Sequence, residues 1–481
     1  MKVIVSNIIQ IENPSENIIK WAKTNLTFKN PEYSQKVKLG LWTGGTPKYL
    51  TLYNIVDNNL YLPVGCYEDL VNTFGMKEPA LNYDLRSEVN VNIDTSMKLR
   101  DYQVPAITPF VSRFHSHTNG LIIMPCGLGK TNVALYIAYK LHQKTLFITH
   151  TLDLVNQAHT RCLSNLHCKT SLITEGKVDL SGDIVFATVQ TLVKNLDKIS
   201  PDTFGLLVVD EIHRMTANTT SVGMFRECVE YFSATYKVGL TATLHRSDGL
   251  ESCIPKIIGN VLYEIKDEDK DYVGYLDGRE VIRFDKSEFQ VPAKVNFIKT
   301  NFSLSTTDHY GIVHYKDVFD KSGMTISFAK LMNEICSDED RNKLIIDCVN
   351  NSKGSSLILS DRVSQLEYLQ KYIPNSVVIT GTTKKSVRQQ ALKDVEEGRV
   401  RCLIASYKIA KEGLDLPILE NLFLASPIKD DAIVVQSIGR IQRICGDKSI
   451  ANVYDFVDSE VSTLQRFYYK RKNIYKMKGW L

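Results

Sequence analysis

The sequence predicts an α/β protein in which two parallel sheets flanked by helices follow one another along the chain. The first observation is that short apolar runs alternate with helical patterns. The second is that the apolar runs fall into two series. The first series contains GLIIMP, KTLFITH, TSLITE, DIVFATV, FGLLVVDE and KVGLTAT, and the second contains SSLILS, NSVVITG, RCLIAS, NLFLASP and ANVYDFV. We therefore expect one α/β domain over residues 93–264 and another over residues 341–481.

A small α+β domain is expected ahead of the two sheets, over residues 1–92. Its elements are a strand in KVIVSNIIQIE, a helix that begins at Ser15 with Ile18, Ile19, Ala22 and Leu26 on one side, and a hairpin in YLTLYNIVDNNLYLPVG. Between the two sheets, residues 265–340 are polar and irregular and include the acidic run KDEDKD. We expect a connector with an insertion there.

The composition excludes several classes of protein. The chain has 481 residues, of which 43% are hydrophobic and 23% charged, as is usual for soluble proteins of two or three domains. It has no run of eighteen apolar residues and no signal-peptide core, so we expect a cytoplasmic protein without membrane contact. Its ten cysteines form no C-x-x-C pair, which argues against a disulfide framework or a structural zinc site. The net charge of +4 implies that any basic surface is local.

The segment IIMPCGLGKTN lies between an apolar strand and a helical pattern, where a phosphate-binding loop (P-loop) occurs. Backbone N–H groups and the helix dipole would meet an anion at this turn. Gly127 and Gly129 allow close approach of the backbone, Lys130 can reach the β- and γ-phosphates, and the Thr131 hydroxyl can ligate magnesium. Met124 stands where the motif usually has its first glycine, a position that need not touch phosphate.

The segment FGLLVVDEIHRM places two carboxylates directly after a buried strand. Asp210 can hold a magnesium ion through its water shell, and Glu211 can orient and deprotonate the attacking water. A simple helix cap is the alternative. It does not explain why the same series of strands carries a phosphate-binding loop.

The segment QSIGRIQR in the second series places Arg440 and Arg443 three residues apart on one helical face. Exposed helices often carry such charges for solvation. Phosphoryl transfer, however, is accelerated by a cation brought against the γ-phosphate, and a second domain can supply one.

Together these residues resemble the superfamily 2 helicases and translocases over residues 97–460. The motifs that match, in the family's order, are KLRDYQ, MPCGLGKT, THTLDLVNQ, ATVQTL, DEIH, GLTATLHRSDG, SLILSDRVSQLEYL, SYKIAKEGLDLP and QSIGRIQR. The resemblance implies two RecA-like domains that use ATP and Mg²⁺. The combination PCGLGKT, DEIH and TATLHRSD is similar to the XPB branch, and GLWTGGTPK is similar to phage-encoded helicases of the UvsW and T5 types, which act on branched DNA.

The resemblance also implies roles for individual residues. Nucleotide contacts are expected from Gln103, Pro125, Cys126, Gly127, Leu128, Gly129, Lys130, Thr131, Gly413 and Asp415. Catalytic roles are expected from Lys130, Asp210, Glu211, Gln436, Arg440 and Arg443, and metal ligation from Thr131 and, through water, from Asp210. Coupling of hydrolysis to movement is expected from His213, Thr241 and Thr243.

Nucleic-acid contacts are expected from Arg246 and from the C-terminal segment LQRFYYKRKNIYKMKGWL, which has no acidic residue. Lys470, Arg471 and Lys472 would meet phosphates, and the interleaved aromatic residues would meet bases or sugars. The alternative is a terminal amphipathic helix that docks by its aromatic residues and leaves its lysines in water. The resemblance places the main track on the face formed by the third, fourth, seventh and eighth motifs.

The function expected from the sequence is that of a monomeric, ATP-dependent DNA helicase or translocase that unwinds or branch-migrates forked and junction DNA in recombination, repair or replication. It would work in the host cytoplasm if a bacteriophage encodes it. A transcript-release translocase or an RNA helicase is the second possibility, because the motor core does not distinguish its track. An ATP-gated clamp or annealing factor is the non-motor possibility.

Overall fold

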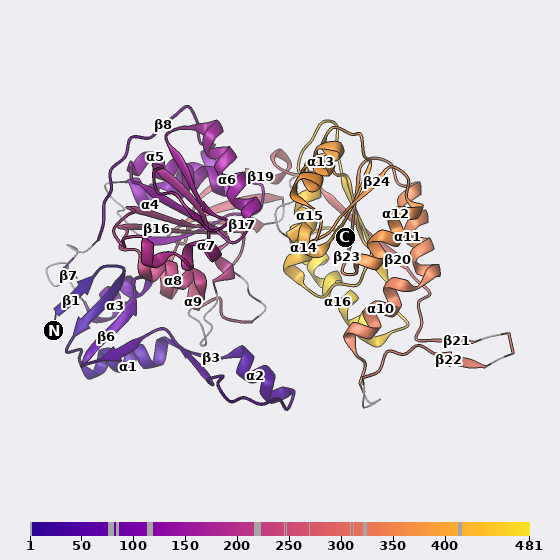
Figure 1. The fold of residues 1–481 in the computed structure, drawn as a ribbon, viewed down its shortest axis with the longest axis horizontal. Helices are drawn as coiled ribbons and strands as arrows, with labels where there is room; N and C mark the ends of the chain where they lie inside the picture. The colour runs from indigo at the N-terminus through magenta and orange to yellow at the C-terminus, as the bar shows by residue number, and fades with distance from the viewer. Residues whose placement is uncertain are drawn as a thin grey trace. The chain divides into compact units, whose positions relative to one another are not determined.

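The computed structural model describes residues 2–75, 81–82, 86–112, 119–215, 223–244, 246, 248–268, 270–307, 309–310, 312–320, 325–411 and 416–481. The chain forms two compact units, Met1–Phe284 and Asp285–Leu481 (Figure 1), and each is described by itself. Among the described residues, none of the helices has both the length and the apolarity that crossing a bilayer requires.

Unit 1 is built on a ten-stranded sheet that contains all six strands of the first predicted series. In spatial order the strands are β13 (Lys177–Val178), β12 (Thr170–Thr174), β14 (Ile184–Thr188), β10 (Thr145–Thr149), β15 (Leu206–Val209), β16 (Tyr236–Thr241), β9 (Asn119–Ile123), β17 (Val261–Glu268), β18 (Asp271–Leu276) and β19 (Arg279–Asp285). The strands from β12 to β17 pair in parallel. Every residue of β10, β14 and β15 is buried, as expected for parallel strands covered on both faces.

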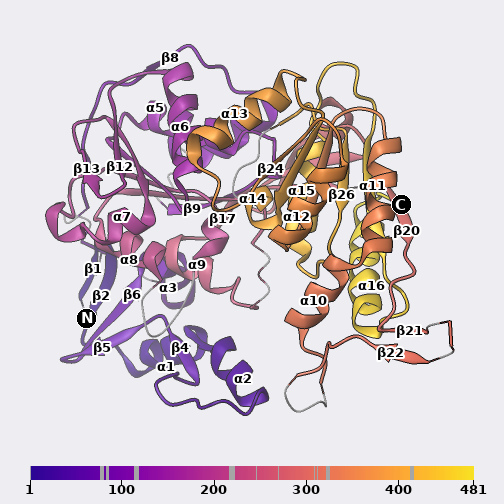
Figure 2. The same cartoon turned by 45° about the vertical axis from the view of Figure 1, so that its right-hand side comes forward.

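Helices cover both faces of this sheet (Figures 1 and 2). On one side lie α4 (Val104–Val111), α5 (Lys130–Leu141) and α6 (Leu152–Asn165), and on the other lie α7 (Val189–Val193), α8 (Met224–Tyr231) and α9 (Cys253–Ile258). Short elements between them are η3 (Asp101–Gln103), η4 (Leu196–Lys198), η5 (Ile212–Arg214) and the paired strands β8 (Asp94–Thr95) and β11 (Leu166–His167).

The N-terminal region forms a second, smaller sheet in unit 1. Its order is β5 (Asn54–Val56), β6 (Asn59–Pro63), β2 (Ile8–Glu12), β1 (Lys2–Val5) and β7 (Leu81–Asn82). Around it lie α1 (Glu16–Asn25), the pair β3 (Thr27–Lys29) and β4 (Tyr49–Thr51), α2 (Pro31–Lys38), η1 (Val64–Cys66) and α3 (Tyr67–Phe74). The predicted helix is present and buries Ile18 and Ala22. The single strand predicted over residues 2–12 is instead the hairpin of β1 and β2.

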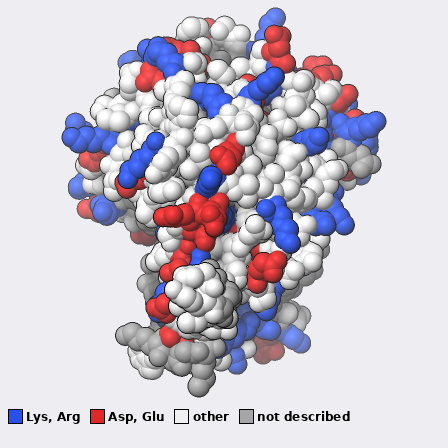
Figure 3. All heavy atoms as spheres, turned by 90° about the vertical axis from the view of Figure 1, so that its right-hand side faces the viewer, with Lys and Arg blue, Asp and Glu red and all other residues white. Residues whose placement is uncertain are grey.

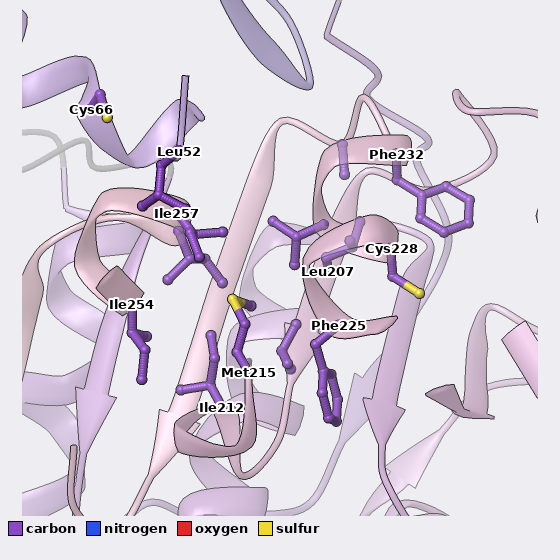
Figure 4. Close-up of a cluster of buried hydrophobic side chains, with 14 of the residues drawn as sticks. Leu52, Cys66, Leu207, Ile212, Met215, Phe225, Cys228, Phe232, Ile254 and Ile257 are labelled. Atoms are coloured by element: carbon purple, nitrogen blue, oxygen red, sulfur yellow. The ribbon is translucent and has the colours of Figure 1, made fainter. Parts of the chain in front are cut away.

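The N-terminal region shares one hydrophobic core with the large sheet. Leu52 lies beside Ile257 of α9, as Figure 4 shows, and the Cys66 thiol donates to the Lys256 carbonyl over 3.5 Å. Polar contacts strengthen the joint, because the Asn260 amide donates to Glu68 over 2.6 Å. The boundary predicted at residue 92 therefore separates two sheets but not two compact units.

The connector predicted over residues 265–340 is corrected by the structure. Residues 261–285 form β17, β18 and β19 of the first sheet, and β20 (Ala293–Lys299) belongs to the sheet of unit 2. In the acidic run KDEDKD, Glu268 ends β17 and pairs with Asp271, which begins β18. Turns have the same polar composition as linkers. The remaining part holds a hairpin of β21 (Ser305–Thr307) and β22 (Val313–Tyr315), and α10 (Phe328–Ser337).

Unit 2 is built on a six-stranded parallel sheet that contains all five strands of the second predicted series. The order is β20, β27 (Ala451–Val457), β26 (Asn421–Leu424), β23 (Ser356–Ser360), β25 (Cys402–Ser406) and β24 (Ser376–Ile379). One face packs on α11 (Glu339–Asn351) and α12 (Val363–Tyr372). The other packs on α13 (Lys385–Glu396), α14 (Tyr407–Lys411), α15 (Asp431–Ile441) and α16 (Ser462–Met477). A short η6 (Lys286–Glu288) precedes β20.

The C-terminal segment is a docked helix, α16, and this corrects one predicted contact. Arg471 is 3% exposed and forms a two-pronged ion pair with Asp455, with N–O distances of 2.8 and 2.6 Å. Its third nitrogen donates to the Ile428 carbonyl. A guanidinium held in this way cannot contact nucleic-acid phosphate. Lys470 is exposed and Lys472 is half-buried beside the ring of Tyr468, so both stay predictions.

Lys237 of β16 generates a prediction about pH and stability. Its ammonium group is buried beside the Val229 carbonyl, and burial lowers its pKa from 10.5 to about 7. Between those values the unfolded chain binds more protons than the folded chain, so stability should rise with pH across this window. The limiting slope is about 1.4 kcal/mol per pH unit.

We expect Lys237→Met to remove this contribution. Urea unfolding of unit 1 at pH 7.5 and 9.5 measures it, and Lys177→Met on the exposed β13 is the matched control. An equal pH slope in the parent protein and in Lys237→Met would show that Lys237 is not a buried, neutral amine.

Candidate nucleotide site

The candidate site lies in unit 1, where β9, β10, β15 and β16 end. Parallel strands place their carboxyl ends at one edge, where ligands of α/β sheets bind. The loop after β9 is tied to β16, because the Met124 N–H donates to the Thr241 carbonyl over 3.0 Å. The end of β15 is tied to β10, because the Asp210 N–H donates to the Ile148 carbonyl over 2.9 Å. These bonds bring the loop, Asp210 and Thr241 to one edge.

The loop between β9 and α5 has the backbone that phosphate binding requires. Gly127 and Gly129 have φ values of 89° and 81°, and Gly129 caps the N-terminus of the twelve-residue helix α5. N–H groups at such a terminus attract anions. The Lys130 ammonium donates to the Met124 carbonyl over 3.0 Å. The Met124 side chain is fully buried, so an apolar residue at this position is explained by the core.

Hydrogen bonds from the segment that precedes α4 also hold this loop in place. The Gln103 side-chain amide donates to the Leu128 carbonyl over 2.9 Å, and its oxygen accepts from the Arg100 N–H over 3.0 Å. The Tyr102 hydroxyl reaches the same Leu128 carbonyl over 3.4 Å. The structure therefore places Gln103 against the loop, and its contact with adenine stays a prediction.

The two carboxylates differ in environment. Asp210 is buried, and burial raises the pKa of its carboxyl, with a further contribution from the charge of Glu211. Burial also raises the pKa of Glu211, but hydrogen bonding to His213 and the charges of Lys130 and Arg214 outweigh it and lower that pKa. Of the two carboxylates, Glu211 is therefore the one that stays ionised as the pH falls.

His213 connects Glu211 to the end of β16. The His213 Nδ1 atom lies 3.1 Å from Glu211 Oε2 and 3.0 Å from Thr241 Oγ1. The Thr241 hydroxyl donates to the Thr243 carbonyl, and the Thr243 N–H donates back to Thr241 Oγ1. Since Thr241 has one hydroxyl hydrogen and a carboxylate only accepts, Nδ1 must carry the proton. The three predicted coupling residues therefore form one chain with Glu211.

Arg161 of α6 is a member of this site that the sequence did not indicate. Its guanidinium lies 3.5 Å from Thr131 Oγ1, and Arg161 and Asp210 are charged neighbours. It lies thirty residues from Thr131 in sequence and belongs to no motif, so only the packing of α5 against α6 reveals it.

Thr131 and Asp210 fit a magnesium ion by their chemistry, because both offer hard oxygen donors. Among the described residues no group of three or more His, Cys, Asp and Glu side chains could hold a metal. Magnesium is usually bound by one or two carboxylates together with phosphate oxygens. When bound with a nucleotide, the ion would neutralise phosphate charge.

Arg246, predicted to contact nucleic acid, has a different role in the structure. Its side chain is nearly buried and pairs with Asp248, with Nε 2.8 Å from Oδ1. It also donates to the carbonyls of His213 and Met215. The prediction is corrected, because these contacts occupy the guanidinium. Through these hydrogen bonds Arg246 joins the segment after β16 to the segment after β15.

In unit 2, α15 carries Gln436 and Arg440 but ends at Ile441. Arg443 lies beyond the helix, where its backbone pairs with Gln290. The prediction that the two arginines share a helical face is therefore wrong, because the helix does not extend to the second one. Gly413 and Asp415 lie outside the described residues.

Charges of both signs cover the face in Figure 3, where blue Lys and Arg groups are interspersed with red Asp and Glu groups. This agrees with the modest net charge of +4. Nucleic-acid contacts have to be sought in local clusters of cations.

Two family models match the chain. Residues 96–246 match the type III restriction enzyme res subunit family, and residues 340–445 match the helicase conserved C-terminal domain. The two ranges fall on the two predicted RecA-like domains, residues 93–264 and 341–481, and cover most of each. Both sheets have the expected parallel order, so the predicted fold class is confirmed.

Relatives resemble the chain over most of its length. L396 of Acanthamoeba polyphaga mimivirus, named as an ATP-dependent RNA helicase, is 26% identical over 98% of this chain and 83% of its own. D10 of Escherichia phage T5, named as a helicase, is 27% identical over 74% of this chain and 71% of its own. The DNA 3'-5' translocase XPB2 of Sulfurisphaera tokodaii is 25% identical over 73% of this chain and 80% of its own. The predicted resemblance to the XPB-like and phage-encoded branch is confirmed.

The geometry predicts different effects for two substitutions. Lys130→Ala removes a cation from the loop and should weaken nucleotide binding and abolish hydrolysis. Glu211→Gln removes a carboxylate but not the loop, so it should keep nucleotide affinity and lose hydrolysis. Binding of a fluorescent ATP analogue and steady-state phosphate release measure the two effects. Lys140→Ala, at the other end of α5, is the matched control. Normal turnover in either site variant would refute the assignment.

Proposed function

The chain belongs to the superfamily 2 helicases. We propose that it is an ATP-dependent DNA helicase or translocase that remodels forked and branched duplexes. Its helicase domains imply ATP-dependent action on nucleic acid. The observation that carries the proposal is the chain of contacts from Glu211 through His213 to Thr241, beside the phosphate-binding loop.

Each side chain at this edge has a part in the proposed hydrolysis. Lys130 would bind phosphate oxygens, and Thr131 and, through water, Asp210 would hold Mg²⁺. Glu211, with its lowered pKa, accepts a hydrogen bond from the attacking water and orients it. A shift of Glu211 would move His213 and, through its contact with Thr241, also Thr243. Hydrolysis would in this way change the position of the segment that follows β16.

DNA is the proposed track because the XPB2 relative is named as a DNA translocase. The preference for branched DNA rests on the resemblance of GLWTGGTPK to phage-encoded helicases that act on such substrates. RNA is the second candidate, because the L396 relative is named as an RNA helicase. We propose that the protein acts as a monomer in the cytoplasm, that of the bacterial host if a phage encodes it.

A panel of labelled substrates tests the proposed function. Forks, four-way junctions, plain duplexes and RNA hybrids of equal length are incubated with the protein, ATP and Mg²⁺, and strand displacement is followed. We expect forks and junctions to be processed fastest, and Lys130→Ala to be inactive on all of them. Faster unwinding of RNA hybrids would favour the RNA helicase, and nucleotide-dependent binding without displacement would favour a clamp.

We propose Gln436, Arg440 and Arg443 as the contribution of unit 2 to catalysis. If Arg443 stabilises charge on the γ-phosphate, Arg443→Ala should lower kcat by on the order of 10³ and change nucleotide affinity much less. Steady-state kinetics and nucleotide titration check this. Arg399→Ala, which removes an exposed arginine paired with Asp394, is the matched control. Loss of affinity alone would assign Arg443 to ground-state binding or to the fold.

A further inference from the structure

The N-terminal arm, defined here as residues 29–50, exposes apolar side chains that the fold does not use. It comprises α2, which buries none of its residues, and the loop that follows, at the margin of unit 1 (Figures 1 and 2). Val37, Leu39 and Leu41 are exposed, and Trp42 is 82% exposed. Four exposed apolar side chains within residues 37–42 make this segment a candidate site of interaction.

The arm is nevertheless braced by its own hydrogen bonds. Asn30 caps α2 by accepting from the Glu32 N–H, and its amide donates to the Pro47 carbonyl over 2.8 Å. The Lys36 ammonium donates to Thr46 Oγ1 over 2.6 Å. The loop therefore has a defined shape, and its exposed side chains are held in place.

Trp42 is presented as a flat surface. A Cβ atom added at Gly44 would lie 1.9 Å from the Trp42 ring, so the indole rests directly on the Gly44 backbone. Only glycine permits this approach. With one face supported in this way, the ring stays 82% exposed and can stack on a second aromatic group.

The arm is also basic. Lys29, Lys36, Lys38 and Lys48 against the single acid Glu32 give the segment a net charge of +3, close to the +4 of the whole chain. Lys36 is partly neutralised by an ion pair with Glu32 at 2.8 Å. Lys29, Lys38 and Lys48 are exposed.

A groove of about 650 Å³ runs along the arm. Lys29, Ser34, Gln35 and Lys38 contribute to one wall, and the turn of residues 248–250 contributes to the other. The Asp248 carboxylate in that turn is already paired with Arg246, so the lysines dominate the charge of the groove. Arg246 also holds the carbonyl of Met215, after β15. The contacts of Arg246 with Asp248 and with the Met215 carbonyl therefore link the turn that lines the groove to the segment after β15, which begins with Asp210 and Glu211.

We propose that the N-terminal arm is a binding site for a single strand of nucleic acid, in which Trp42 stacks on a base while Lys29, Lys38 and Lys48 contact the backbone phosphates. The proposal rests on the proposed function, because it gives the motor a second, separate contact with its track. Cations beside an exposed aromatic ring suit an anionic polymer with flat bases. A neutral protein partner, or a second copy of this basic chain, would use the apolar residues but would not explain the lysines.

Intrinsic fluorescence tests the stacking directly. The chain has three tryptophans, of which Trp21 packs against Phe74 and Trp480 is buried in the core of unit 2. Titration of the full chain with oligo(dT) should therefore quench the emission of Trp42 and protect it from iodide. Trp42→Phe should abolish the quenching, and Trp21→Phe should retain it. Quenching that persists in Trp42→Phe would overturn the proposal.

The lysines are tested through salt dependence. In Lys29→Glu/Lys38→Glu the slope of log K against log salt should become shallower by about 0.7 for each lost phosphate contact on a single strand. Lys140→Glu/Lys177→Glu, elsewhere on unit 1, is the matched control and should leave the slope unchanged. An unchanged slope in the arm variant, with thermal unfolding like that of the parent, would overturn the phosphate contacts.

Two outcomes separate this proposal from the proposed function. If the parent protein binds nucleic acid and hydrolyses ATP but Trp42 is not quenched, only the arm site fails. If the parent binds no nucleic acid at all, the proposed function fails as well. Emission of Trp42 that changes with protein concentration and not with oligo(dT) would mean that a second copy covers the arm, and would overturn the proposal.

Discussion

Two adjacent carboxylates at the end of a strand buried on both faces are the feature on which the rest of the candidate site depends. Removing an ionised carboxylate from water costs several kcal/mol unless partners compensate the charge. Lys130 and Arg161 surround Asp210 with positive charge, and His213 holds Glu211. Lys130 also donates to the Met124 carbonyl, so the shape of the loop and the charge of the carboxylates are linked. A nucleotide that binds Lys130 must therefore affect both the shape of the loop and the ionisation of the carboxylates.

The N-terminal region extends this connected structure. Its sheet shares a core with the large sheet through α9, and the segment that follows β16 joins both the groove of the arm and the carbonyls after β15. The same unit thus contains a site suited to phosphate and a surface suited to an anionic strand. In the function proposed here these two sites would influence each other, and Arg246, which contacts Asp248 at the groove and the carbonyls of His213 and Met215, lies between them.

The fold and the loop could be predicted from the sequence because both depend on local signals. Eleven apolar runs became eleven parallel strands, and the glycines of the loop lie between a strand and a helix, as the spacing predicts. Two of the errors concern arginines that are held in part by groups distant in sequence. Arg471 pairs with Asp455 and Arg246 with backbone after β15, and nothing in either segment distinguishes these arginines from solvent-exposed ones. Arg161 lies outside every motif, so the sequence gives no sign of its role, and the polar, acidic composition of residues 266–271 makes β17 to β19 resemble a connector in sequence.

We propose that the nucleotide site in unit 1 is coupled to a DNA track. Magnesium-dependent ATP hydrolysis by the full chain, measured as forked DNA is added, tests it most directly. We expect slow hydrolysis without nucleic acid, a saturable rise in rate with forked DNA and a smaller rise with RNA of the same sequence. Hydrolysis that is equally fast with and without nucleic acid would contradict it.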